Sequence, residues 1–225
     1  MTSLFQHLPN QPRSPECQAA YTILMNAHDT SSSFLETFNT IRHNRVARGT
    51  PTDEEQDLLR AMLAFACAGL DSMTKQLIRD ALPNLLNNND GAIKMFRTFV
   101  ERQMKNGDDI DHKLLADVLS DHNPRNRLID LLVRDLTSRS LQSTEEILKA
   151  VSYFDIPSVQ IVADPSHLTN IFRARNQIVH EMDVDFSQTN RNRRPRARQV
   201  MFNYTNSIFH VSRGLLDAVD IKVPT

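Results

Sequence analysis

The chain has few of the residues that form disulfide frameworks, tight turns and sheets. Its 225 residues include two cysteines, five glycines, three tyrosines and no tryptophan. Cys17 and Cys67 are too far apart for a closely spaced zinc motif and too few for a disulfide framework, so we expect two buried, inert thiols. The scarcity of glycine and tyrosine argues against an all-β protein, whereas abundant leucine, alanine, arginine, glutamine and methionine favour helix. We therefore predict an all-α fold.

The sequence also lacks a long apolar run and an excess of charge of one sign. The longest apolar run, residues 61–70, lies between Arg60 and Asp71 and is too short to cross a bilayer. The first residues show no cationic segment followed by an apolar core. These features predict a cytoplasmic protein without membrane contact. The formal net charge of -1 excludes a general polycation, so contact with nucleic acid would have to be local.

The length favours one domain rather than two unrelated ones. We expect a flexible N-terminal arm over residues 1–14 and a single helical domain over residues 15–225. The block of residues 90–160 has no distinctive signature. It is either a helical insertion that shapes access to substrate or a set of extra helices packed on the core. The helices expected in this block are residues 92–104, 112–119 and 125–136 and one beginning at Ser143.

Capping signals predict where the longer helices begin. A serine, a proline and a glutamate at residues 14–16 start a first helix that should run toward Arg48. Thr52, with Glu55 three residues later, predicts a capping box for a second helix, which should reach about residue 82 before Pro83 stops it. A final amphipathic helix is expected over residues 199–219.

A third cap, Asp164 followed by Pro165, starts a helix that contains the sequence Arg-Asn-Gln-Ile-Val-His at residues 175–180. Apolar residues mark the packed side of this helix, and they are Leu168, Ile171, Phe172, Ile178, Val179 and Met182. Histidine can transfer a proton near neutral pH, arginine suits phosphate oxygens, and asparagine can orient either one. At about 100° per residue, Arg175 and His180 lie about 140° apart around a regular helix. One straight helix would therefore aim them at different targets, unless the helix is distorted or a second copy of the chain supplies one of them.

This segment resembles the motif of the HEPN superfamily, small helical domains in which an arginine, a polar residue, a short spacer and a histidine mark a ribonuclease site. Residues 60–83 are similar to the long early helix of that family, including the RiboL-PSP-HEPN group. Asp71 stands where many relatives carry glutamate. The resemblance implies an antiparallel helical bundle with additional central helices. It also implies Arg175, Asn176 and His180 as catalytic residues. For Asp71 two interpretations stay open, a supporting role in which it pairs with Arg175 and an ordinary aspartate on the helix surface.

The activity that the resemblance implies is metal-independent and needs no cofactor. The ribose 2′-hydroxyl attacks the adjacent phosphate and leaves a 2′,3′-cyclic phosphate and a 5′-hydroxyl. The resemblance also implies a homodimer with a composite active site, a toxin or anti-phage defence setting, and an inhibitory partner or antitoxin. Relatives paired with a nucleotidyltransferase antitoxin commonly carry a tyrosine two residues after the histidine, where this chain has Met182, which argues against control by that modification.

Each of two charged clusters near the motif could bind a ligand or could simply be a solvated part of the surface. The acidic residues 181, 183 and 185 follow the histidine but form a weak metal-ligand set, and a solvated acidic segment is the better interpretation. The basic run could bind RNA phosphates beside the site, or it could be a loop whose charge balances those acids. Its members are Arg191, Arg193, Arg194, Arg196 and Arg198.

Two other functions remain open at this stage. The chain could be a non-catalytic HEPN-like module that binds nucleotide, RNA or a protein through the same cleft. It could also be a structural subunit of a helical assembly. Removal of His180 discriminates between them, because only an enzyme has cleavage to lose, and only a structural subunit would change its stability or assembly alone.

Overall fold

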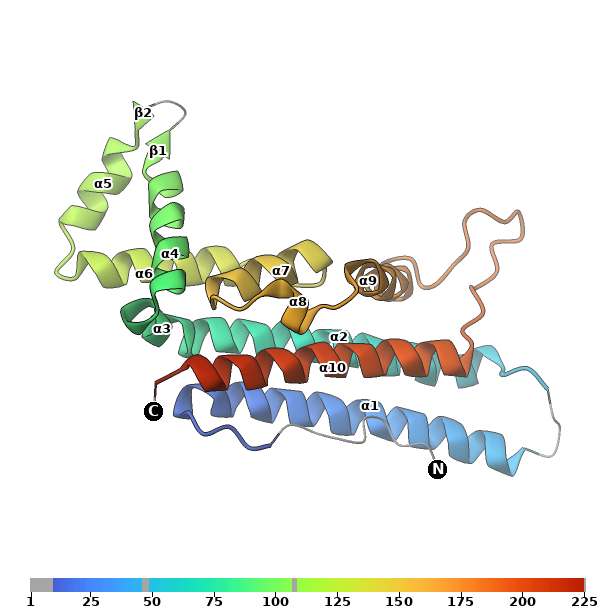
Figure 1. The fold of residues 1–225 in the computed structure, drawn as a ribbon. Helices are drawn as coiled ribbons and strands as arrows, with labels where there is room; N and C mark the ends of the chain where they lie inside the picture. Colours follow the sequence, from blue (N-terminus) through green and yellow to red (C-terminus); the bar gives the residue numbers. More distant parts are fainter. Residues whose placement is uncertain (1–9, 46–48, 107–108, 225) are drawn as a thin grey trace.

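Three long helices lie side by side in the computed structural model, which describes residues 10–45, 49–106 and 109–224 (Figure 1). They are α1 (Gln18–Asn44), α2 (Asp53–Asp80) and α10 (Arg198–Lys222). The central helix α2 packs against both of the others and contributes many of the fully buried side chains. Gly69 permits close approach of α1, because a Cβ atom at this position would lie 2.3 Å from the Cβ of Ala27.

Shorter helices cover one side and one end of this three-helix layer (Figure 1). Among the described residues, the only sheet is a two-residue antiparallel ladder in which Lys105 lies opposite Ile110. The fold is therefore all-α, as the composition predicted. The remaining elements are a 3-10 turn at Pro15–Cys17, α3 (Leu82–Asn88), α4 (Asp90–Gln103), β1 (Lys105–Asn106), β2 (Asp109–Ile110), α5 (His112–Leu119), α6 (Pro124–Thr137), α7 (Thr144–Tyr153), α8 (Ser158–Ile161) and α9 (Pro165–His180).

The predicted capping box at the start of α2 is confirmed. The backbone N–H of Thr52 donates to Glu55 Oε2 at 2.8 Å, and the N–H of Glu55 donates to Thr52 Oγ1 at 3.3 Å. The predicted end of this helix differs. It stops at Asp80, and Pro83 stands in the first turn of α3, where the missing N–H of proline leaves no helix hydrogen bond unmade.

The N-terminal segment is fixed to α10 at Ser14, the last residue of the expected arm. Ser14 is fully buried, and its N–H and Oγ both donate to Asp220 Oδ1, at 2.8 and 2.6 Å. The first helix begins with a short 3-10 turn before α1, which ends at Asn44. Residues 1–9 of the arm and residues 46–48, where the first helix was expected to end, lie outside the described residues.

The helix that carries the motif, α9, packs against α2 and is seen almost end-on in Figure 1, so it crosses the long helices steeply. Its predicted cap is confirmed, because Asp164 Oδ1 accepts a hydrogen bond from the N–H of His167 at 3.0 Å. The expectation that it continues through Met182 is wrong. The helix ends at His180, and Met182 and Asp183 adopt positive φ angles of 50° and 61°.

The packed side of α9 is also shorter than expected. Leu168, Ile171 and Phe172 are buried as predicted, but Val179 is 40% exposed and Met182 is 67% exposed. The end of α9 and the residues that follow it therefore leave apolar side chains at the surface near His180. Among the described residues, none of the helices combines the length and the apolar character that a membrane-spanning segment needs.

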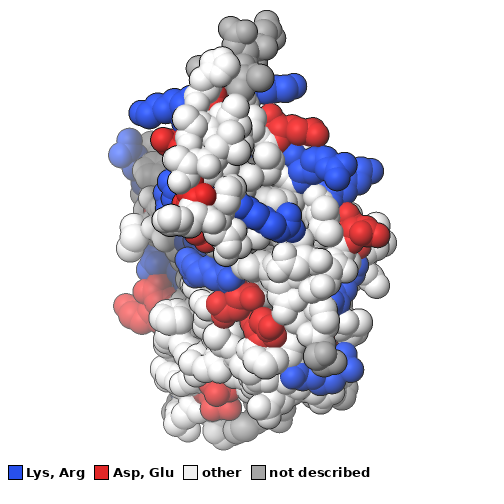
Figure 2. All heavy atoms as spheres, turned by 90° about the vertical axis from the view of Figure 1, so that its left-hand side faces the viewer, with Lys and Arg blue, Asp and Glu red and all other residues white. Residues whose placement is uncertain are grey.

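Charged side chains of both signs are mixed on the end of the molecule formed by the shorter helices. Figure 2 shows this end, which is the left-hand side of Figure 1, with basic and acidic groups interspersed. A surface of this kind attracts neither polyanions nor polycations strongly.

Candidate functional site

Arg175 and His180 meet at the C-terminal end of α9. Arg175 Nη1 lies 3.1 Å from His180 Nε2 and donates to Asn176 Oδ1 at 3.0 Å. A guanidinium group can only donate hydrogen bonds, so His180 Nε2 accepts and the imidazole carries its proton on Nδ1. Asn176 and His180 are exposed and Arg175 is half-buried. The three side chains thus form a hydrogen-bonded group that solvent can reach.

This geometry corrects the expectation that one straight helix keeps Arg175 and His180 apart. Their Cα positions differ in direction, but the arginine side chain is long and flexible, and His180 is the last residue of α9. The two side chains therefore meet within a single chain. The angular argument for a site shared between two copies is lost, and a dimer has to be argued from other features.

The side chain of Arg175 is held against α2. Its Nε atom is buried without a hydrogen-bond partner among the described residues. Its positive charge is close enough to Cys67 of α2 to oppose the effect of burial, which raises the pKa of that thiol to about 12. Burial likewise raises the pKa of Cys17 to about 11. Both thiols are buried and free, as predicted, and at neutral pH they stay protonated and unreactive.

Asp71 does not have the role that the resemblance implies. Its Oδ2 accepts from Lys75 Nζ at 3.0 Å and its Oδ1 accepts from the backbone N–H of Leu141 at 2.6 Å. These contacts use both carboxylate oxygens, and none of its contacts among the described residues is with Arg175. Asp71 instead ties α2 to the segment that leads into α7.

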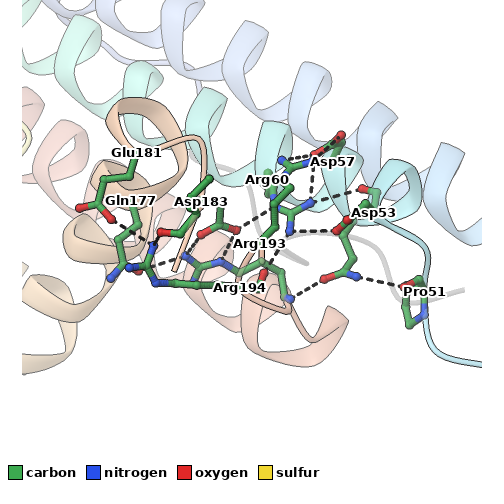
Figure 3. A network of polar contacts seen from close by, with 12 residues as sticks. Pro51, Asp53, Asp57, Arg60, Gln177, Glu181, Asp183, Arg193 and Arg194 are labelled. Atoms are coloured by element: carbon green, nitrogen blue, oxygen red, sulfur yellow. Dashed lines mark hydrogen bonds and ion pairs between the residues drawn. The ribbon is translucent and has the colours of Figure 1, made fainter. Parts of the chain in front are cut away.

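A buried ionic cluster fixes the chain immediately after His180 (Figure 3). Its centre is the fully buried Asp183. Arg60 Nε and Arg196 Nε donate to Asp183 Oδ2 at 2.8 and 2.9 Å, and Arg196 Nη2 donates to Asp183 Oδ1. The backbone N–H of Asp183 also donates a hydrogen bond to the carbonyl oxygen of Gln177 in the last turn of α9, at 2.8 Å. We call Arg60, Asp183 and Arg196 the Asp183 cluster.

The Asp183 cluster was not recognised in the sequence. Arg60 stood there only as the residue that bounds an apolar run, and it is 123 residues distant from Asp183 in the chain. The available signal was an arginine placed directly before an apolar helical run, since a cation that becomes buried at such a place requires a partner. The sequence alone does not say which carboxylate that partner is.

Most of the arginine-rich run is engaged in contacts within the chain. Arg193 Nη2 donates to Asp57 Oδ1 at 2.6 Å, and Arg194 Nη1 donates to Glu181 Oε2 at 3.0 Å (Figure 3). Arg198 Nε donates to Asn39 Oδ1 at 3.0 Å. Arg191 is exposed, and within the described residues its side chain has no partner. The run mainly balances neighbouring acids and fastens residues 181–197 to α2, and of its five arginines Arg191 alone lacks a side-chain partner in the described part of the chain.

The carboxylates near the motif likewise form contacts within the chain. The hydrogen bonds from Arg193 lower the pKa of Asp57, so this carboxylate stays charged well into the acid range. The alternating acids at 181, 183 and 185 bind arginines or, for Asp185, mainly Ser187. Among the described residues, no group of three or more histidine, cysteine, aspartate or glutamate side chains is placed to hold a metal ion.

Comparison with known proteins adds no assignment to this geometry. No family model, no curated protein and no solved structure matches the chain. The functional interpretation of Arg175, Asn176 and His180 therefore depends on their own positions and chemistry.

A pocket opens next to the motif, between α9 and the start of α7. It has a volume of about 480 Å³, and Asn176 and Gln177 of α9 line one side of it. Gln142 and Thr144 line the opposite side. Asn176 lines this pocket and also accepts a hydrogen bond from Arg175, so it stands between the pocket and the Arg175–His180 pair.

Proposed function

We propose that the chain is a metal-independent endoribonuclease of the HEPN type. The observation that carries the proposal is the 3.1 Å contact between Arg175 and His180 at an exposed helix end, with Asn176 beside it. A permanent cation and an imidazole that can accept or donate a proton then face the same small region of solvent. That pair suits a phosphodiester, because cleavage needs both proton transfer and stabilisation of negative charge.

In the proposed reaction, the ribose 2′-oxygen attacks the adjacent phosphorus. A bond forms between the 2′-oxygen and phosphorus, the bond from phosphorus to the 5′-oxygen breaks, and the products are a 2′,3′-cyclic phosphate and a 5′-hydroxyl. One proton leaves the 2′-hydroxyl and one proton joins the departing 5′-oxygen. His180 performs one of these transfers, a contribution of typically about 10²–10⁴-fold. Arg175 stabilises the charge on the phosphoryl oxygens, and Asn176 orients Arg175 or the phosphate.

Binding of the phosphate would also release His180. In the free protein, Arg175 donates to the Nε2 lone pair of the imidazole. A phosphate oxygen carries negative charge and is a stronger acceptor than a neutral imidazole, so it should draw the guanidinium away. The Nε2 atom then becomes available to take the proton of the 2′-hydroxyl.

The second proton transfer motivates a homodimer. Among the described residues, His180 is the only histidine in contact with Arg175, so one chain offers a single imidazole for two transfers. A second copy facing the first would provide another His180 in a composite site. The exposed Val179 and Met182 beside His180 support this arrangement, since a facing copy would remove them from water.

The proposed setting is a cytoplasmic toxin or anti-phage defence effector restrained by an inhibitory partner or antitoxin. This part of the proposal rests on the resemblance to HEPN ribonucleases. Met182 in place of the tyrosine favours restraint by binding rather than by modification at that position.

The decisive experiment is incubation of the purified protein with total RNA in excess EDTA, followed by mapping of the fragment ends. Wild-type protein should leave cyclic-phosphate and 5′-hydroxyl ends, and His180→Ala should leave the RNA intact. His122→Ala is the matched control, because His122 is exposed and lies between α5 and α6, and this variant should cleave normally. Intact RNA with wild-type protein that nevertheless binds RNA would replace the proposal with the non-catalytic module.

A further inference from the structure

The pocket between α7 and α9 has the size and lining of a small polar ligand site. Its volume of about 480 Å³ lies within the range of about 300–1,000 Å³ that is usual for such sites. Amide and hydroxyl side chains make up most of its polar lining, together with one guanidinium and the carboxylates of Glu145 and Glu181, and Phe172 contributes an apolar wall. The polar members used in this argument are Gln142, Thr144, Thr169, Arg173, Asn176 and Gln177.

These groups match the functional groups of a nucleoside better than those of a simple anion. Amides both donate and accept hydrogen bonds, which the edge of a base and the ribose hydroxyls require. The Thr144 and Thr169 hydroxyls bond each other at 2.8 Å, so the amides of Gln142, Asn176 and Gln177 carry this part of the recognition. Arg173 adds one exposed cation. Its only side-chain contact among the described residues is a long one, 3.4 Å to Asn170 Oδ1 on the same helix. This guanidinium is thus available to stack on a base or to contact a phosphate.

Asn176 joins this pocket to the Arg175–His180 pair. Its Oδ1 atom accepts from Arg175, whereas its Nδ2 atom has no partner among the described residues and remains free to donate to a ligand in the pocket. A ligand that fills the pocket therefore lies one side chain away from the site proposed for the scissile phosphate.

We propose that this pocket binds the base and ribose of the nucleotide on the 5′ side of the cleaved bond. The proposal rests on the ribonuclease function, since the attacking 2′-hydroxyl belongs to that ribose and has to lie within reach of His180. The pocket then selects which base precedes the cut, through Gln142 and Gln177 at its edge and Arg173 at its rim.

Binding can be tested without any cleavage. The four nucleoside 3′-monophosphates, which have the base, ribose and phosphate of the 5′-side nucleotide and contain no bond to cut, are titrated into the full-length protein by calorimetry. At least one of them should bind more tightly than inorganic phosphate. Arg173→Ala should weaken it about tenfold, the loss expected for one charged hydrogen bond. Arg97→Ala, which removes an exposed arginine on α4, should leave the affinity unchanged.

A second readout is the sequence at the cut sites of the active enzyme. Gln142→Ala should change the preferred base before the cut. Nucleotide binding that depends on Arg173, without RNA cleavage, would refute the ribonuclease and leave the pocket as a nucleotide site. Cleavage with unchanged base preference in Gln142→Ala, or nucleotide affinity no greater than that of inorganic phosphate, would refute the pocket and leave the ribonuclease.

Discussion

At the scale of single residues, the planar guanidinium of Arg175 does more than supply a positive charge. It reaches both Asn176 and His180 with one nitrogen, and its Nε atom is buried against α2. Lysine would keep the charge but lose the fork of donors that can hold His180 or a phosphate in a fixed direction. A conservative substitution therefore separates charge from geometry at this site.

For Arg175→Lys we expect kcat for RNA cleavage to fall about 10²-fold, the usual cost of one misplaced donor to a charged transition state. KM should change much less, because a cation remains to attract the phosphate. Single-turnover cleavage of a short RNA measures both quantities. Equal loss in Arg173→Lys, or an unchanged kcat in Arg175→Lys, would show that the guanidinium geometry at residue 175 is not used.

Asp183 is the residue whose neutralisation should harm folding most. It is fully buried between Arg60 and Arg196, and Arg60 is itself only 3% exposed. Asp183→Asn would remove the buried carboxylate that Arg60 shares with the partly buried Arg196, and Arg60 would keep only the exposed Asp53 and Asp57 as acidic partners. A broken buried ion pair typically costs about 3–5 kcal/mol.

We therefore expect Asp183→Asn to lower the free energy of unfolding by roughly 3 kcal/mol, measured by urea denaturation at pH 7. Asp117→Asn is the control, because Asp117 is exposed on α5, and its effect should stay within about 0.5 kcal/mol. A loss as small as that of the control would mean that the Asp183 cluster relaxes without cost.

At the scale of elements, the starts of helices followed from local sequence and their ends did not. Thr52 with Glu55, and Asp164 with Pro165, predicted the starts of α2 and α9, because a cap lies next to the groups that it satisfies. The end of α9 depends on Asp183, which binds an arginine 123 residues away. Local patterns contain no information about such a partner.

The arginine-rich loop is a second case in which the local sequence did not reveal the partners of its side chains. Its composition predicted either RNA contacts or charge balance, and periodicity could not decide between them. The structure brings Arg193 to Asp57 of α2 and Arg194 to Glu181, so charge balance accounts for most of the run. The candidate site was predicted in residues 175–180, but the direct contact of Arg175 with His180 was not. The angle between two positions around a helix axis takes no account of how far a long side chain extends.

The link between α2 and the arginine-rich loop should weaken in acid. Hydrogen bonds from Arg193 lower the pKa of Asp57 below its usual value of 3.8. A carboxylate whose pKa is depressed by folding stabilises the folded state fully above its unfolded-state value. That contribution is lost as pH falls from there through the folded-state value.

We expect the difference in free energy of unfolding between wild type and Asp57→Asn to be constant from about pH 6 to 8 and to shrink below about pH 4. Urea denaturation at several pH values measures this difference, and subtracting the two proteins removes the contribution of other carboxylates. A difference that persisted undiminished at pH 2 would rule out the ionised Asp57–Arg193 pair as its source.

At the scale of the whole molecule, the three-helix layer serves as a rigid base for α9. Fully buried side chains of α2 pack toward α1 and α10, while Asp71, Arg60 and Asp57 of the same helix hold the segments on either side of the motif. The motif is thus fixed from α2 by packing and by ion pairs. The last turn of α9 is left at the surface, with Val179 and Met182 exposed around His180.

A surface of this kind is what the proposed homodimer would cover, and a charge placed in it should separate the two copies. Met182→Glu puts a carboxylate at a 67% exposed apolar position, so it should leave folding intact, shift the mass in solution from dimer to monomer, and abolish RNA cleavage. Leu119→Glu introduces the same charge at a position that is 66% exposed on α5 at the other end of the molecule, and it should change neither property. Light scattering coupled to size exclusion measures the mass. A wild-type monomer that cleaves RNA, or a Met182→Glu monomer that retains activity, would show that one chain completes both proton transfers and that the composite site does not exist.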